Sequence, residues 1–145
     1  MVYNNPFGRV PDYVHAPIVL YGYSSIVQGT WGFNGSANNC NNAATHANGD
    51  ELQHKLWLPG GTYTLSFGFN KDADFGIAKL YIDGALIATQ DMYNATPLSG
   101  QYLITLGIVL TGEGVRTIRW VVDGKHASSS GYKVAYVNPM LARTV

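Results

Sequence analysis

The sequence predicts an all-β domain, an antiparallel β-sandwich of jelly-roll type with an extended N-terminal arm. Apolar and polar residues alternate with period two in several segments, as in half-buried strands. Glycine, proline and Asp-Gly pairs separate these segments, as turns separate antiparallel strands. The 145 residues fit one domain, which we divide into an arm over 1–16 and a sandwich over 17–145.

Alternation locates the main strands. In the strand predicted at 62–69, one face carries Tyr63, Leu65, Phe67 and Phe69. In the strand predicted at 101–110, one face carries Tyr102, Ile104, Leu106, Ile108 and Leu110. A third strand, at 115–124, places Trp120 in the core. Further strands are predicted at 17–27, 76–82, 85–91 and 131–138. Asp83-Gly84 is the favoured pair for a two-residue hairpin turn.

Residues 50–58 are compatible with two structures. As a helix, Asp50 would cap the first turn and Gln53 would complete a capping box. As a strand, the segment turns Leu52, Leu56 and Leu58 inward and Trp57 outward. We favour the strand, because eight regular strands would complete two sheets.

Composition narrows the classes of partner. Nine Lys and Arg balance nine Asp and Glu, whereas a nucleic-acid-binding domain usually has a concentrated basic surface. No apolar run approaches the ~20 residues of a membrane helix. The single cysteine, Cys40, rules out an internal disulfide and fits folding in a reducing cytoplasm. We therefore expect neither a nucleic-acid nor a membrane partner.

Two long stretches carry a family resemblance. They are LPGGTYTLSFGFNKDADFGIAKLYIDGALIATQDMY at 58–93 and GVRTIRWVVDGKHASSSGYKVAYVNPMLAR at 114–143. Together they resemble β-sandwich modules of tailed-phage virion proteins, such as tail fibres, tailspikes and capsid-surface proteins, and more loosely carbohydrate-binding modules. The resemblance implies a non-catalytic virion module, often trimeric. It assigns no binding residue, since such modules share a scaffold more than a site.

Catalytic and metal-binding patterns are weak. Cys40, His46 and Asp50 lie in the asparagine-rich segment 34–50, which we expect to be a long polar loop and too irregular to fix a nucleophile and its base. The sequence contains no Gly-x-Ser-x-Gly elbow, Walker-type loop or dinucleotide fingerprint. Asn70, Asp72 and Asp74 have the spacing of calcium ligands but lack the closing acid, so we expect a hairpin connection. We predict no enzyme activity, cofactor or metal.

Exposed aromatic rings beside amides suit sugar binding, since a ring covers the apolar face of a pyranose while amides bind its hydroxyls. The candidate glycan or subunit contacts are Trp31, Trp57, Asn39 and Asn42. In the arm, the candidate anchors to a neighbouring subunit or shell are Tyr3, Phe7 and Tyr13. An arm that packs on its own domain is an equal alternative.

These observations lead to two functional hypotheses. The first is a capsid decoration (cement) protein, a homotrimer docked by its arm to other virion proteins and assembled in the host cytoplasm. The second is a receptor-binding module of a tail fibre or tailspike that binds surface polysaccharide. A carbohydrate-binding module from an enzyme is a third and weaker option.

Overall fold

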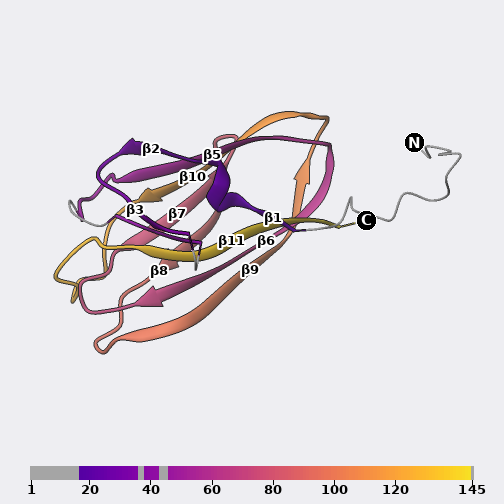
Figure 1. Ribbon diagram of the computed structural model, residues 1–145. Coiled ribbons are helices and arrows are strands. Elements are labelled where there is room, and N and C mark those ends of the chain that lie inside the picture. The colour runs from indigo at the N-terminus through magenta and orange to yellow at the C-terminus, as the bar shows by residue number, and fades with distance from the viewer. Residues whose placement is uncertain (1–16, 36–37, 43–45, 145) are drawn as a thin grey trace, which may run out of the picture.

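The computed structural model describes residues 17–35, 38–42 and 46–144, except the side chains of Ile104 and Leu106. It confirms the antiparallel β-sandwich: two sheets lie face to face (Figure 1). The predicted arm over 1–16, with Tyr3, Phe7 and Tyr13, lies outside the described residues. Within the described part of the chain, no helix is long and apolar enough to cross a membrane.

Every strand pairing in the two sheets is antiparallel. Sheet A has the order β3 (Gly32–Asn34), β4 (Asn39–Asn41), β11 (Ala135–Thr144), β6 (Gly61–Lys71), β9 (Leu98–Leu110), and β1 (Ile18–Val19) also pairs with β11. Sheet B has the order β2 (Ser24–Gln28), β5 (Glu51–Leu58), β10 (Gly114–Val122), β7 (Ile77–Ile82), β8 (Ala85–Asp91). A short 3-10 turn, η2 (Leu20–Tyr23), connects β1 in sheet A to β2 in sheet B.

Several predicted elements are confirmed. Residues 51–58 form strand β5 rather than a helix, with Leu52, Leu56 and Leu58 buried. Their period of two fits a strand that contacts the core through one face. Asp83 and Gly84 have φ values of 48° and 84°, as a two-residue hairpin turn of this type requires.

Other boundaries were wrong. The strand predicted over 17–27 is interrupted by η2, which turns Leu20 into the core and carries the chain from sheet A to sheet B. The strand predicted at 131–138 instead begins at Ala135 and continues to Thr144. The segment 34–50, expected to be one polar loop, contains strand β4. There Cys40, which is apolar enough to be buried, lies opposite Tyr136.

A bulge in β9 overturns the predicted facing of that strand. Tyr63 pairs with Ile108 but Leu65 pairs with Thr105, so β9 contains one extra residue between these pairs. Gly107, with φ of 74°, supplies the left-handed conformation of such a bulge. The extra residue reverses the side on which the preceding residues point. Ile108 is buried as predicted, but Tyr102 is 74% exposed.

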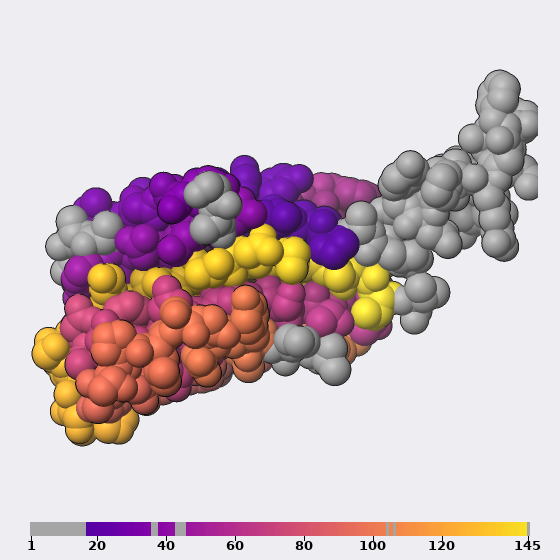
Figure 2. All heavy atoms as spheres, turned by 60° about the horizontal axis from the view of Figure 1, so that its bottom comes forward, coloured from indigo at the N-terminus to yellow at the C-terminus, as the bar shows by residue number. Residues whose placement is uncertain are grey.

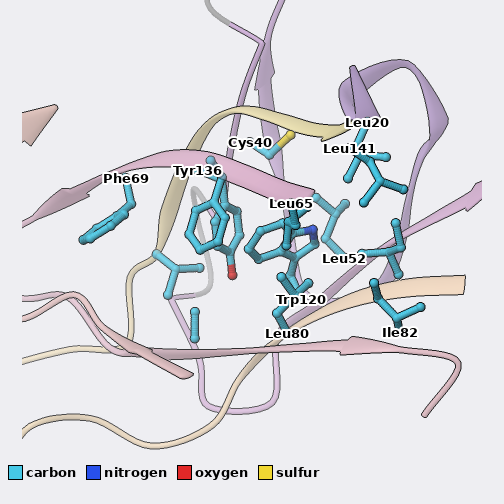
Figure 3. Packing of buried hydrophobic residues seen from close by; sticks show 14 of the residues in the cluster. Leu20, Cys40, Leu52, Leu65, Phe69, Leu80, Ile82, Trp120, Tyr136 and Leu141 are labelled. Atoms are coloured by element: carbon cyan, nitrogen blue, oxygen red, sulfur yellow. The ribbon is translucent and has the colours of Figure 1, made fainter. Parts of the chain in front are cut away.

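Aromatic rings fill the centre of the core (Figure 3). Trp120 of β10 and Tyr136 of β11 come from opposite sheets, and their ring centroids are 4.1 Å apart. Phe67 packs edge-on against Trp120 at 4.6 Å, a favoured geometry for aromatic pairs. Trp120 is 1% exposed, which confirms the prediction that it belongs to the core.

Candidate functional site

Three connections are joined at one end of the sandwich, which we call the loop end: 72–76 between β6 and β7, 92–97 between β8 and β9, and 123–134 between β10 and β11. Backbone hydrogen bonds interlock them. The N–H of Asp72 donates to the Met92 carbonyl at 3.2 Å, and the N–H of Gly76 donates to the Lys133 carbonyl at 2.7 Å. The N–H of Lys133 donates in turn to the Asp74 carbonyl at 3.1 Å. These bonds fix the three connections to one another.

Asn42 attaches the segment after β4 to the loop end. Its Nδ2 donates to Asp50 Oδ2 at 2.9 Å and to the Tyr132 carbonyl at 3.0 Å. Its Oδ1 accepts from the N–H of Val134 at 2.8 Å. Asn42 is fully buried, so its proposed contact with a glycan or subunit is wrong. A buried amide needs internal partners, and these bonds supply them.

A pocket of about 250 Å³ opens at the loop end, and we call it the loop-end pocket. It is lined by Asn70, Lys71, Asp72, Phe75, Pro97, Leu98, Ser99 and Lys133. Phe75 is 5% exposed and contributes an apolar wall. Lys133 extends over this ring, with Nζ 5.4 Å from its centroid. The pocket therefore combines an apolar wall with amine, amide, hydroxyl and carboxylate groups, the usual mixture in a site for a small polar ligand.

An exposed tyrosine lies beside this pocket on the outer face of sheet A. Tyr102 pairs with Gly68, and a Cβ built on Gly68 would lie 3.2 Å from Tyr102 Cε1. The ring therefore rests over the bare backbone of the glycine, while 74% of the residue stays exposed. We call this ring, over Gly68, the Tyr102 platform. Figure 2 shows the molecule from this side, with yellow β11 between violet β3 and β4 and orange β9.

Strand register relates the platform to the pocket. Gly68, under the platform, and Lys71, in the pocket, are three residues apart on β6, which is about 10 Å along a strand. Asn70 lies between them and lines the pocket. Platform and pocket are thus close enough to contact adjacent parts of one oligosaccharide.

Asn39 lies on the same transverse row of sheet A as Tyr102. The paired residues run from Asn39 to Val137, from Val137 to Gly68 and from Gly68 to Tyr102. Three strand spacings make this row about 14 Å wide. The side chain of Asn39 is partly buried, and its Oδ1 has no hydrogen-bond partner among the described residues.

The two predicted tryptophans lie elsewhere. Trp31 is 5% exposed, stacks on Tyr136 at 6.2 Å and donates from Nε1 to the Gln28 carbonyl at 3.0 Å. Its expected role as a glycan or subunit contact is wrong, because the ring belongs to the core. Trp57 points outward as predicted, 57% exposed beside Val115 on sheet B. It lies near the end of β5 that is remote from the loop end.

Cys40 is not placed to act as a nucleophile. It is fully buried, and burial raises the pKa of its thiol to about 11, so the reactive thiolate is scarce at neutral pH. Asp50 is engaged by Asn42 and by the N–H of Ala47. Across residues 17–35, 38–42 and 46–144, no three His, Cys, Asp or Glu side chains are grouped as metal ligands.

A larger cavity of about 510 Å³ lies between the edge strands β8 and β9. Its wall includes the apolar residues Ile82, Ile87 and Ile108. The charged residues of its wall, Arg116 and Asp83, form an ion pair of 2.9 Å with each other. This cavity offers a glycan fewer free polar groups than the loop-end pocket does, despite its size.

Comparison with known proteins supports the fold. No family model and no curated protein matches the chain. A Paenibacillus xanthan lyase matches with 26% identity and a TM-score of 0.62, over 83% of this chain and 12% of the lyase. The carbohydrate-binding module CBM36, solved with calcium and xylotriose, matches with 16% identity and a TM-score of 0.55, over 88% of this chain and 98% of the module. The CBM36-1 domain of a multidomain xylanase from the hindgut metagenome of Trinervitermes trinervoides matches with 18% identity and a TM-score of 0.51, over 84% and 98%.

These similarities establish a β-sandwich fold shared with carbohydrate-binding modules. The chain spans nearly the whole of two such modules but only 12% of the xanthan lyase. The Tyr102 platform was missed in the sequence, where alternation placed Tyr102 on the same strand face as Ile108. The signal that marked it is Gly107, because a glycine inside a strand often marks a bulge.

Proposed function

We propose that this chain is a non-catalytic carbohydrate-binding module that holds a glycan against the Tyr102 platform and the loop-end pocket. The observation that carries the proposal is the tyrosine ring lying over Gly68, 74% exposed and beside a pocket of polar groups. The fold shared with carbohydrate-binding modules over nearly their whole length supports it.

The chemistry of the platform suits a sugar ring. A pyranose has C–H groups on its faces and hydroxyls at its rim, so it stacks on an aromatic ring and hydrogen-bonds beside it. Asn70 and Ser99 provide an amide and a hydroxyl next to the platform. Because Gly68 has no side chain, the tyrosine ring lies on the sheet without lateral crowding by a Cβ.

The test is affinity electrophoresis through gels containing xylan, mannan, β-glucan or polygalacturonate. We expect the wild-type chain to be retarded in at least one gel. Tyr102→Ala should weaken that binding by at least about tenfold, which corresponds to about 1.4 kcal/mol. The melting temperature should change little, because the removed side chain is largely exposed.

Trp57→Ala is the matched control, since it removes an exposed aromatic ring from the outer face of sheet B. Trp57 is also the alternative site, predicted from the sequence and exposed in the structure. If Trp57→Ala abolishes retardation and Tyr102→Ala does not, the glycan site lies on sheet B. Absence of retardation in every gel would refute glycan binding.

We also propose that the module belongs to a phage virion. A receptor-binding module of a tail fibre or tailspike would use the same glycan site, and a homotrimer would display three copies of it. The alternative is a capsid decoration protein fastened to other virion proteins through Tyr3, Phe7 and Tyr13. Light scattering of the chain with and without residues 2–16 tests this proposal: a monomer in both cases would argue against the arm-linked trimer.

A further inference from the structure

We infer that the loop-end pocket accepts the carboxylate of an acidic sugar, so that the glycan bound by this chain contains uronic acid units. This inference rests on the proposed glycan-binding function and specifies its ligand class. It is based on two lysines that line the same pocket. Lys71 is the last residue of β6, and Lys133 lies in the connection between β10 and β11.

Among the residues that the structure describes, neither lysine forms an ion pair. The ion pairs found among the described residues are formed by other basic side chains, namely Lys79, Arg116 and Arg119. The pocket also contains one carboxylate, Asp72, which forms no ion pair with either lysine in the described structure. Asp72 Oδ1 accepts a hydrogen bond from the N–H of Ala73 at 2.7 Å and so helps to hold its own turn. Two cations against one anion leave the pocket with a net positive charge.

The position of Lys133 favours an anion further. Its Nζ lies 5.4 Å from the centroid of the Phe75 ring, whose burial limits access of water to one side of the amine. A lysine ammonium donates strong hydrogen bonds to a carboxylate, and the attraction grows where water is partly excluded. The residues around it then match the rest of a sugar: Asn70 and Ser99 for hydroxyls, and Leu98 for C–H groups.

The size of the pocket suits one sugar unit. Its volume of about 250 Å³ lies just below the range of about 300–1,000 Å³ typical for pockets that hold drug-sized ligands. The next unit of the polymer would reach the Tyr102 platform, about 10 Å away along β6. A polyuronate would thus be held by charge at one unit and by stacking at a neighbouring unit.

The experiment compares acidic polymers with their neutral counterparts. Polygalacturonate, alginate and glucuronoxylan are each cast in gels beside the same polymer with its carboxylates reduced to alcohols. We expect wild-type chain to bind at least one acidic polymer at least tenfold more tightly than its reduced form. Lys71→Gln and Lys133→Gln should each remove most of this preference while the melting temperature stays close to the wild-type value.

Lys55→Gln is the matched control, because Lys55 is an exposed lysine on sheet B and its loss changes the net charge equally. If Lys55→Gln weakens binding as much as the pocket variants do, the effect is general charge attraction and the inference is refuted. Equal binding of acidic and reduced polymers, or binding only to neutral ones, also refutes it and leaves the proposed function standing. No binding to any acidic, reduced or neutral polymer refutes both.

Discussion

His54→Gln should make the stability of this protein less dependent on pH between about 6.5 and 4. His54 is fully buried in β5, and its Nδ1 lies 3.0 Å from Ser24 Oγ. Ser24 Oγ donates its own hydrogen to the Tyr21 carbonyl at 2.7 Å, so the network assigns the ring proton to Nδ1. The other ring nitrogen, Nε2, is buried with no partner among the described residues, edge-on to Trp120.

Protonation would therefore place a charge on a buried ring whose Nε2 has no partner among the described residues. Burial lowers the pKa of His54 from 6.5 to about 4 in the folded protein. Between these values the unfolded chain binds a proton that the folded chain does not. The stabilisation is fully present above about pH 6.5 and is lost as the pH falls toward 4. The difference between the two pKa values, at about 1.4 kcal/mol for each unit, corresponds to roughly 3 kcal/mol.

The assay is urea denaturation at a series of pH values from 7.5 down to about 4. Carboxylates that are hydrogen-bonded in the fold also contribute to acid destabilisation, so the quantity of interest is the difference between wild type and variant. We expect the free energy of unfolding of wild type to fall by roughly 3 kcal/mol more than that of His54→Gln over this range. Parallel pH profiles for the two proteins would refute the reasoning.

Two further predictions concern the core. Trp31→Ala should lower the free energy of unfolding by about 3–5 kcal/mol, because the ring is buried and stacked on Tyr136. Trp57→Ala should change it by less than about 1 kcal/mol, and equal losses in urea denaturation would contradict the assigned burial. The Cys40 thiol, buried and with a pKa of about 11, should react with a thiol reagent only when the chain is unfolded. Rapid labelling under native conditions would show that β4 opens.

Local patterns predicted most of the sandwich because they depend on burial of one strand face. The alternation in 62–69 and 51–58 gave the correct facing of Leu65 and Leu52, since both strands run without interruption along the core. The failures occur where the chain changes sheet. η2 interrupts the predicted strand 17–27, and its glycine, Gly22, was not taken as a sign that the strand ends near Leu20.

The candidate site was harder to predict, because it depends on long-range pairing. Tyr102 was placed on the same face as Ile108 because the alternation was taken to continue through Gly107, where one extra residue reverses it. Trp57 lies between Leu56 and Leu58, whose alternation turned it outward, whereas Trp31 lies between Thr30 and Gly32, with no such alternation around it. The burial of Trp31 depends on its packing against Tyr136, about a hundred residues later in the sequence.

The loop-end pocket shows the same dependence on tertiary structure. Its lysines, Lys71 and Lys133, are sixty-two positions apart in the sequence and meet through the backbone bonds that join 72–76 to 123–134. Neither lysine belongs to a recognisable local motif. The two lysines lie in one pocket because of the fold, and not because of their spacing along the chain.

The interlocking of the three loop-end connections has a consequence for how specificity can change. Backbone groups make many of the bonds that hold these connections together, and Asp72 is a pocket residue whose side chain adds to them. A ligand would meet connections that are already bonded to one another, so little affinity would be lost to ordering the chain. If the proposed site is correct, substitutions of its other lining residues should change the ligand that it accepts without the sandwich having to refold.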